Sequence, residues 1–212
     1  MGRIKQGILG GFSGKVGPVI GASWKGITYM RGIAQSIANP QTAGQLDVRA
    51  KFSLIAAFCQ PVSQFLQASF KAYAVRMTGI NAAFAYNIQN AVTGAYPNYA
   101  VDYPNALVAR GSLAGALNQA AASTVAGTAV FTWDDNSGEI GASAIDKTML
   151  LVINPVKKQA VSVSQLAERA DGTQTITLPS SFSGDLVQCY INFIDAAGEV
   201  SNSAFAGAVT IA

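Results

Sequence analysis

The spacing of apolar residues changes twice along the chain and divides the sequence into three regions. The first region, residues 1–38, contains two runs rich in β-branched and aromatic residues, "PVIGASW" and "ITYMRGI", which flank Lys25 and Gly26. A two-residue connection that ends in glycine, between two runs of this kind, is a hairpin signal. We therefore expect residues 1–38 to form an arm that contains a β-hairpin.

The second region, residues 39–104, has helical spacing. Apolar residues recur there every four positions, at Leu46, Ala50, Leu54 and Phe58. This period favours a helix, and Pro61 suits the first turn of a second one. A third helix is expected to begin near Thr78, and Pro97 and Pro104 exclude helix beyond it. The region is predicted to be a small module of three helices.

The third region, residues 105–212, consists of short runs separated by turn residues, and several of the runs alternate between apolar and polar positions. The seven runs are 106–113, 128–135, 148–155, 160–166, 173–179, 186–195 and 203–211. Seven short strands over about 100 residues are typical of an antiparallel β-sandwich. Phe131, Trp133 and Ile176 are expected to face its core. The predicted fold class is α+β, with an N-terminal hairpin arm, a helical module and a C-terminal seven-stranded sandwich.

The composition is apolar for a chain without a membrane span. Half of the residues are hydrophobic and 12% are charged, and the mean hydropathy is +0.29. No stretch reaches the roughly 18 uninterrupted apolar residues of a membrane helix, so we expect no membrane insertion. Because the cores of subunit interfaces are depleted in charge, the composition favours a protein that covers part of its surface with other subunits.

The few charges are segregated along the chain. Residues 1–104 contain nine Lys and Arg against two Asp, a net charge of +7, whereas residues 105–212 contain five Lys and Arg against nine Asp and Glu, a net charge of −4. Two interpretations stay open. Either two modules differ in composition, or the basic part of one subunit docks on the acidic part of the next, which would give a head-to-tail assembly.

The sequence offers little catalytic chemistry, because it contains no histidine and so lacks the usual general base near neutral pH. Asp134, Asp135 and Glu139 in "DDNSGE" could form an acid–base pair or a calcium loop, but Asn136 and Gly138 favour a hairpin turn. Catalytic residues, metal ligands and cofactors are therefore not assigned, and an enzyme that uses carboxylates alone ranks last.

The two cysteines, Cys59 and Cys189, match no metal or redox spacing. Cys189 alternates with apolar residues and is expected to face a core. A disulfide between the two is left open.

The N-terminal region combines cations with aromatic residues and has no acid before Asp47. Such a segment could bind single-stranded nucleic acid. It carries few positive charges for that role, so nucleic acid is disfavoured as a partner. The glycine-rich stretch "GILGGFSG" lacks the ending and the preceding strand of a phosphate-binding loop and is interpreted as flexible. We predict a subunit interface in this region, formed by Phe12, Trp24, Lys25, Tyr29 and Arg31.

Several stretches of the sequence resemble two known groups of proteins. The stretches "FTWDD", "CYINF" and "GEVSNS" look like a fibronectin type III or immunoglobulin-like module. Over most of the chain, "GKVGPVIGASWKGITYMRG", "NPQTAGQ", "RGSL", "FTWDDNSG" and "DKTMLLVINP" resemble a family of uncharacterised proteins from Bacteroidota and their phages. The second resemblance implies that arm, helices and sandwich occur together, and it implies no activity.

The function expected from the sequence is that of a non-enzymatic structural protein that assembles with itself, as a subunit of a filament, a ring, a virion or a cell-surface structure. A virion or extracellular location is favoured. The alternative is a binding module whose sandwich holds a glycan or protein ligand. Its visible aromatic cluster is Tyr96, Tyr99 and Tyr103, which could equally pack the two modules together.

Overall fold

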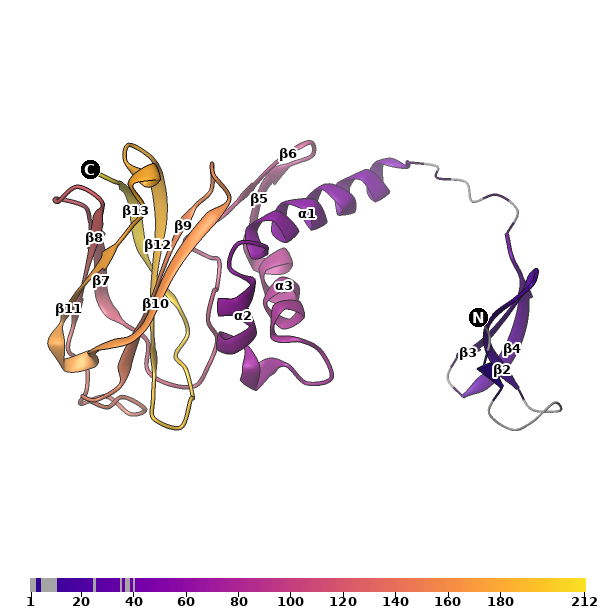
Figure 1. Cartoon of the computed structure of the whole chain (residues 1–212), viewed down its shortest axis with the longest axis horizontal. Coiled ribbons are helices and arrows are strands. Elements are labelled where there is room, and N and C mark those ends of the chain that lie inside the picture. The colour runs from indigo at the N-terminus through magenta and orange to yellow at the C-terminus, as the bar shows by residue number, and fades with distance from the viewer. Residues whose placement is uncertain (1–2, 5–10, 25, 35, 37–38, 40) are drawn as a thin grey trace. The chain divides into compact units, whose positions relative to one another are not determined.

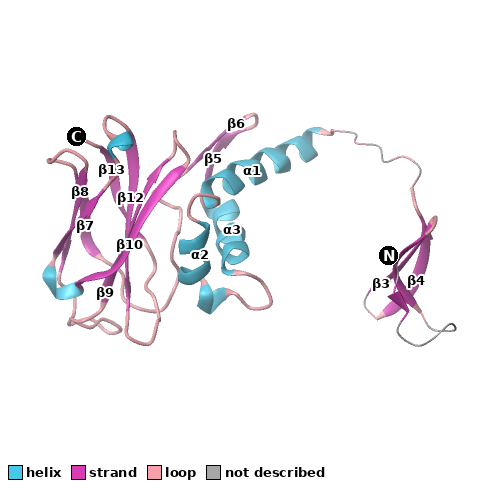
Figure 2. Cartoon of the chain, viewed as in Figure 1, coloured by secondary structure: helices cyan, strands magenta, loops and turns pink. Residues whose placement is uncertain are grey.

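The computed structural model describes residues 3–4, 11–24, 26–34, 36, 39 and 41–212. The chain forms two compact units, Met1–Thr42 and Ala43–Ala212 (Figure 1). The described elements of the smaller unit are all strands, whereas the larger unit contains both helices and strands (Figure 2).

The smaller unit is a four-stranded antiparallel sheet, called the N-terminal sheet below. Its strands follow one another in chain order: β1 (Arg3–Ile4), β2 (Phe12–Val16), β3 (Val19–Trp24) and β4 (Ile27–Gly32). The predicted hairpin is confirmed, since β3 and β4 pair up to Trp24 and Ile27 on either side of a two-residue turn. Gly26 has a φ of 84° there, a conformation open to glycine at little cost, and Lys25 lies outside the described residues.

The interpretation of "GILGGFSG" as flexible is wrong where the structure describes it, because Phe12, Ser13 and Gly14 lie in β2. Gly14 pairs with Gly21 in the next strand. Two facing glycines let neighbouring side chains cover the backbone, so a glycine-rich sequence is compatible with a strand here.

The larger unit begins with the three predicted helices, which are confirmed. They are α1 (Ala43–Cys59), α2 (Ser63–Ser69) and α3 (Gly79–Asn90), with a short 3₁₀ helix, η1 (Lys71–Tyr73), before the last. The hydroxyl of Thr78 accepts a hydrogen bond from the Asn81 N–H at 3.2 Å and so caps α3. Within the described residues, none of the helices is long and apolar enough to cross a membrane.

A hairpin that the sequence analysis did not predict follows α3. It consists of β5 (Val92–Ala95) and β6 (Asn98–Val101). Pro97 lies in the turn between the two strands, where its missing N–H removes no ladder hydrogen bond. The proline excludes a helix, as predicted, but it does not exclude a hairpin.

The rest of the chain is the predicted seven-stranded sandwich. Its strands are β7 (Leu117–Ala122), β8 (Thr128–Asp134), β9 (Lys147–Asn154), β10 (Gln159–Glu168), β11 (Thr173–Thr177), β12 (Leu186–Ile194) and β13 (Ala204–Thr210), with short 3₁₀ helices η2 (Arg169–Asp171) and η3 (Ser180–Phe182). One sheet has the order β11-β8-β7 and the other β10-β9-β12-β13, with antiparallel pairing. Figure 1 shows the helices of this unit beside the sandwich.

One of the seven predicted strands is wrong, because residues 106–113 form an irregular connector and the first strand of the sandwich begins at Leu117. The run is apolar because it is buried, with Val108 and Ala109 fully inaccessible. Its backbone groups bond to residues that include Ser69 and Ser203, and Leu113 forms only an isolated β-bridge with Ser201.

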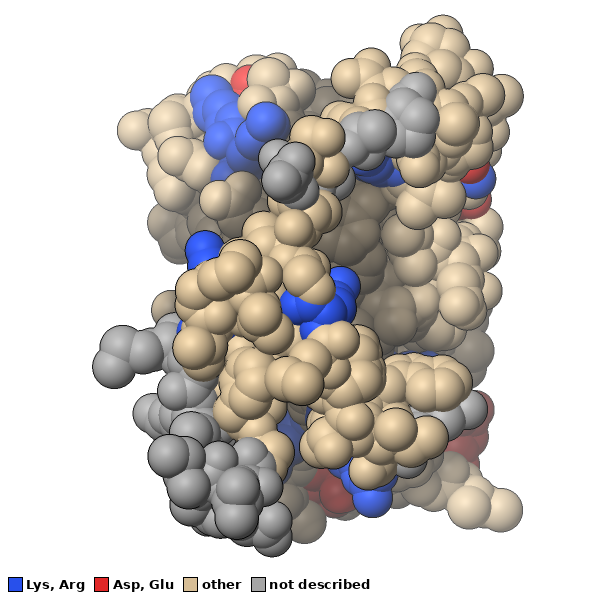
Figure 3. Space-filling model, turned by 90° about the vertical axis from the view of Figure 1, so that its right-hand side faces the viewer, with Lys and Arg blue, Asp and Glu red and all other residues tan. Residues whose placement is uncertain are grey.

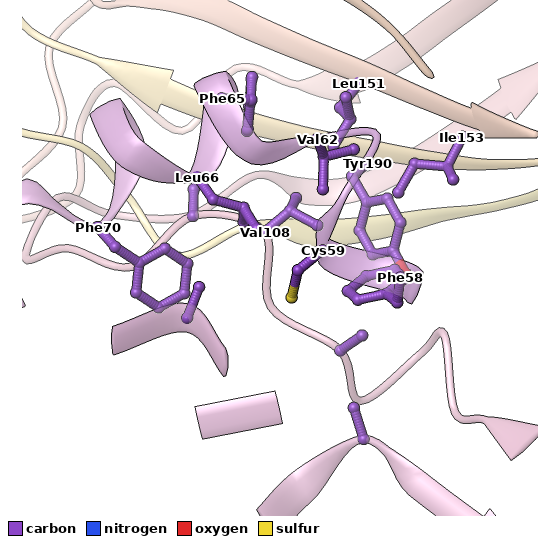
Figure 4. Packing of buried hydrophobic residues seen from close by; sticks show 14 of the residues in the cluster. Phe58, Cys59, Val62, Phe65, Leu66, Phe70, Val108, Leu151, Ile153 and Tyr190 are labelled. Atoms are coloured by element: carbon purple, nitrogen blue, oxygen red, sulfur yellow. The ribbon is translucent and has the colours of Figure 1, made fainter. Parts of the chain in front are cut away.

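Strand β9 is buried on both faces and joins two hydrophobic clusters. Leu150 and Val152 point between the two sheets, in a cluster with Phe131, Trp133 and Ile176, the predicted core residues. Leu151 and Ile153 point the other way, to a cluster formed with the helices, which contains Phe58, Cys59, Val62, Phe65, Leu66, Phe70 and Tyr190 (Figure 4). Helices and sandwich therefore share a core and form a single compact unit.

Candidate interaction surface on the N-terminal sheet

The strand register assigns each residue of the N-terminal sheet to one of two faces. Side chains alternate along a strand, and residues that pair across antiparallel strands lie on the same face. Trp24 pairs with Ile27, Ala22 with Tyr29, and Ile20 with both Lys15 and Arg31. We define the Trp24 face as Lys15, Ile20, Trp24, Ile27, Tyr29 and Arg31.

The Trp24 face combines exposed apolar side chains with cations. Trp24 is 63% exposed, Ile27 66% and Tyr29 45%. Large apolar side chains with this exposure mark interaction surfaces when they are contiguous, and Trp, Tyr and Arg are the residues that dominate the energetics of protein interfaces. In the view of Figure 3, Lys and Arg side chains (blue) lie among uncharged side chains (tan).

The opposite face has a small contact of its own. A Cβ atom on Gly21 would lie 2.7 Å from the ring of Phe12, so this ring covers the backbone of Gly21. Met30 is on the same face and is 70% exposed. The two hydrophobic clusters formed by the described residues include none from this sheet. A sheet whose described large apolar side chains are mostly exposed gains stability when it packs against another surface.

The predicted interface residues are thus only partly brought together. Trp24, Tyr29 and Arg31 share one face, Phe12 lies on the other, and Lys25 lies outside the described residues. Sequence reasoning missed Lys15 and Ile27. The two-residue turn at Lys25-Gly26 fixes the pairing of Ile27 with Trp24 and could have identified Ile27, whereas Lys15 required the unpredicted strand β2.

The acidic turn after β8 is held by its own hydrogen bonds. The Ser137 N–H donates to Asp135 Oδ1 at 2.9 Å, and this bond lowers the pKa of Asp135. Asn136 Nδ2 donates to Glu139 Oε2 at 3.0 Å, and Asn118 Nδ2 donates to Asp134 Oδ2 at 2.7 Å. The segment contains a turn, but the predicted hairpin is wrong, because β8 and β9, the strands that it connects, belong to different sheets. The described residues contain no cluster of three or more potential metal ligands.

The three tyrosines considered for ligand binding do not form one exposed cluster. The Tyr99 hydroxyl donates to Asp47 of α1, and Lys51 lies over the Tyr99 ring. Tyr103 packs against the Phe58 ring, while Tyr96 is exposed. Tyr99 and Tyr103 therefore pack the β5–β6 segment against the helices.

The two thiols are free and buried in different clusters, Cys59 at the end of α1 and Cys189 between the sheets. Burial raises the pKa of each thiol to about 12. The prediction that Cys189 faces a core is confirmed. Such protonated thiols are poor nucleophiles.

The architecture is a seven-stranded β-sandwich that carries a layer of helices and follows a small N-terminal sheet in the sequence. The chain belongs to a family described as "Family of unknown function (DUF6266)", whose model matches residues 11–207. The match runs from β2 into β13, so most of the sheet, the helices and the sandwich belong to the family together.

None of the curated proteins matches the sequence. Among solved structures, the chain is similar to the fn3 domain of human collagen alpha-1(XX) chain, with 16% identity and a TM-score of 0.37, over 48% of this chain and 87% of that chain.

Proposed function

We propose that this protein is a non-enzymatic structural protein that associates with copies of itself, and that the Trp24 face is its contact surface. The observation that carries the proposal is the exposure of Trp24, Ile27 and Tyr29 on one face of a sheet that has no hydrophobic cluster in the described chain.

Charge complementarity favours a second copy as the partner. Lys15 and Arg31 make the Trp24 face basic. The connections β8–β9, β10–β11 and β12–β13 lie at the same end of the sandwich (Figure 1). Exposed acids gather there: Asp134, Asp135, Glu139, Asp171 and Glu199. We call these connections the acidic end.

The acidic end also exposes apolar side chains. Ile140 is fully exposed and Ile145 is 66% exposed, and a hollow of about 400 Å³ lies beside Ile145 and the β12–β13 turn. An apolar centre surrounded by charges of opposite sign suits the aromatic and basic Trp24 face. A contact between two unlike surfaces of this kind produces a ring or a filament, which a virion or a cell surface could use.

Sedimentation velocity of the full chain over a wide range of concentration tests the proposal. We expect concentration-dependent association that Trp24→Ser weakens by about thirtyfold or more, the effect of removing an interface hot spot. Met30→Ser is the matched control, because it removes an equally exposed apolar side chain from the opposite face. A full chain that stays monomeric, or equal effects of the two substitutions, would overturn the proposal.

A charge exchange tests the partner surface separately. Arg31→Glu is expected to weaken association, and Glu199→Lys in the same chain to restore part of it. If Trp24→Ser abolishes association while no acidic-end substitution changes it, self-association stands and the acidic end is excluded as the receiving surface.

A further inference from the structure

A second polar site lies in the larger unit, on the irregular connector between β6 and β7, where the sequence had predicted a strand. The backbone around Arg110 is firmly held. The Arg110 N–H donates to the Ser69 carbonyl at 3.2 Å, and the Ser203 N–H donates to the Ala109 carbonyl at 3.0 Å. A Cβ atom on Gly111 would lie 1.8 Å from the Val200 carbonyl oxygen, so only glycine fits there.

The Arg110 side chain stands between two tyrosines. Its guanidinium carbon lies 4.3 Å from the ring centroid of Tyr73, which comes from η1, and 5.1 Å from that of Tyr86, which comes from α3. Stacking on aromatic rings uses the flat faces of a guanidinium and leaves the N–H donors at its edge available.

Those donors have no acceptor in the part of the chain that the structure describes. Each of the four salt bridges there involves another cation, and the side-chain hydrogen bonds include none from the Arg110 guanidinium. The Arg110 guanidinium is therefore held in place and can still form a bidentate contact with an anion.

The space next to the guanidinium has a lining that fits a small carboxylate. It is a hollow of about 250 Å³, formed by Tyr73, Met77, Ala82, Ala85, Tyr86, Gln89 and Arg110. Met77, Ala82 and Ala85 provide an apolar wall for a short aliphatic stem, and Gln89 adds an amide. Arg110 is the one charged residue of this lining, and Lys71 and Arg76 flank Tyr73 and Met77 in the sequence.

We propose that the hollow beside Arg110 is a binding site for the carboxylate of a glutamate side chain in an acidic peptide. The guanidinium binds the two carboxylate oxygens through parallel N–H···O bonds, and the apolar wall contacts the methylene groups of the side chain. The site is separate from the Trp24 face, so it does not depend on self-association.

The test uses the intact ¹⁵N-labelled chain and follows the Nε–Hε resonance of Arg110, assigned by its loss in Arg110→Lys. N-acetyl-glutamate methylamide is expected to shift this resonance in a saturable way, with a dissociation constant in roughly the millimolar range typical of one small contact. The neutral isostere N-acetyl-glutamine methylamide is expected to cause no saturable shift. Glutarate serves as a third probe and tells a free diacid from a peptide side chain.

Variants test whether Arg110 binds a ligand or only stacks on the two tyrosines to stabilise the fold. Arg110→Lys keeps the charge but loses the planar guanidinium, and we expect it to weaken binding at least about tenfold. Because this variant lacks the Arg110 resonance, its binding is measured from the ring resonances of Tyr86. Tyr73→Leu removes one stacking partner at an exposed position and is also expected to weaken binding, while Lys71→Gln, the charge control, is not. Binding is expected to persist in Trp24→Ser. Equal shifts with the neutral probe, or equal losses in Lys71→Gln and Arg110→Lys, would overturn the proposal.

Discussion

Arg169 shows how much one buried cation organises at the acidic end. Its Nη2 atom lies 3.0 Å from Asp146 Oδ2, and its Nη1 atom donates to Asn136 Oδ1 at 2.7 Å. It also donates to the Ala114 carbonyl at 3.0 Å, and the guanidinium carbon lies 3.8 Å from the ring centroid of Phe193. Arg169 is completely inaccessible, so this single side chain joins four segments of the sandwich from inside.

We predict that Arg169→Met lowers the free energy of unfolding by about 3–5 kcal/mol, because it leaves the buried Asp146 carboxylate without its cation. The midpoint of urea unfolding measures this loss. Lys147→Met is the matched control. Lys147 and Glu168 form a surface pair with side chains 39% and 41% exposed, and such pairs contribute about 1 kcal/mol or less.

A double variant tests whether the unpaired carboxylate of Asp146 causes this loss of stability. Arg169→Met combined with Asp146→Leu removes both charges and is expected to regain part of the lost stability. If Arg169→Met and Lys147→Met cost the same, the buried pair does not hold the acidic end.

At the scale of secondary structure, the sequence predicted the elements whose pattern is local. The four-residue spacing in 46–58 gave α1, and the alternation in "TAVFTW" gave the inward set of β8. The prediction of a strand failed for residues 106–113, which are apolar because they are buried and not because they pair with a strand. The same limit applies to the Trp24 face, since Lys15 joins it only through pairing with Ile20 across β2 and β3, a relation that no local pattern contains.

The sequence also could not show that helices and sandwich share a core. Strand β9 has five consecutive apolar residues, Met149 to Ile153. Such a run indicates a strand covered on both faces, but it does not say which element covers the second face. The structure assigns that role to the helices, through Met149, Leu151, Ile153 and Tyr190.

This arrangement predicts how fragments behave. A chain of residues 43–212 is expected to unfold in one cooperative transition, because it retains both clusters. A chain of residues 105–212 loses the helices and exposes the second face of β9 and β12, so we expect it to aggregate or to bind the dye ANS. Circular dichroism and light scattering compare the two. A 105–212 fragment that is monomeric and as stable as 43–212 would show that the helices are an independent domain.

At the scale of the whole molecule, the separation of charge has a measurable consequence for assembly. Residues 1–104 carry +7 and residues 105–212 carry −4, so contacts between unlike parts of two copies attract at long range. Raising the ionic strength from 0.1 M to 1 M shortens the screening length from about 10 Å to about 3 Å. If the Trp24 face meets the acidic end, the association rate should fall with added NaCl, while the apolar part of the contact persists.

The salt dependence distinguishes this docking from association by apolar contacts alone. Salts that are excluded from the protein surface, such as sulfate, strengthen apolar association. We predict that the double variant Lys15→Glu and Arg31→Glu flattens the salt dependence of the association rate, measured by stopped-flow light scattering. Lys71→Glu together with Arg76→Glu changes the net charge equally but leaves the N-terminal sheet intact, and is expected to keep a steeper dependence. Equal slopes in the two variants would mean that net charge, and not the placement of cations on the Trp24 face, governs how the copies meet.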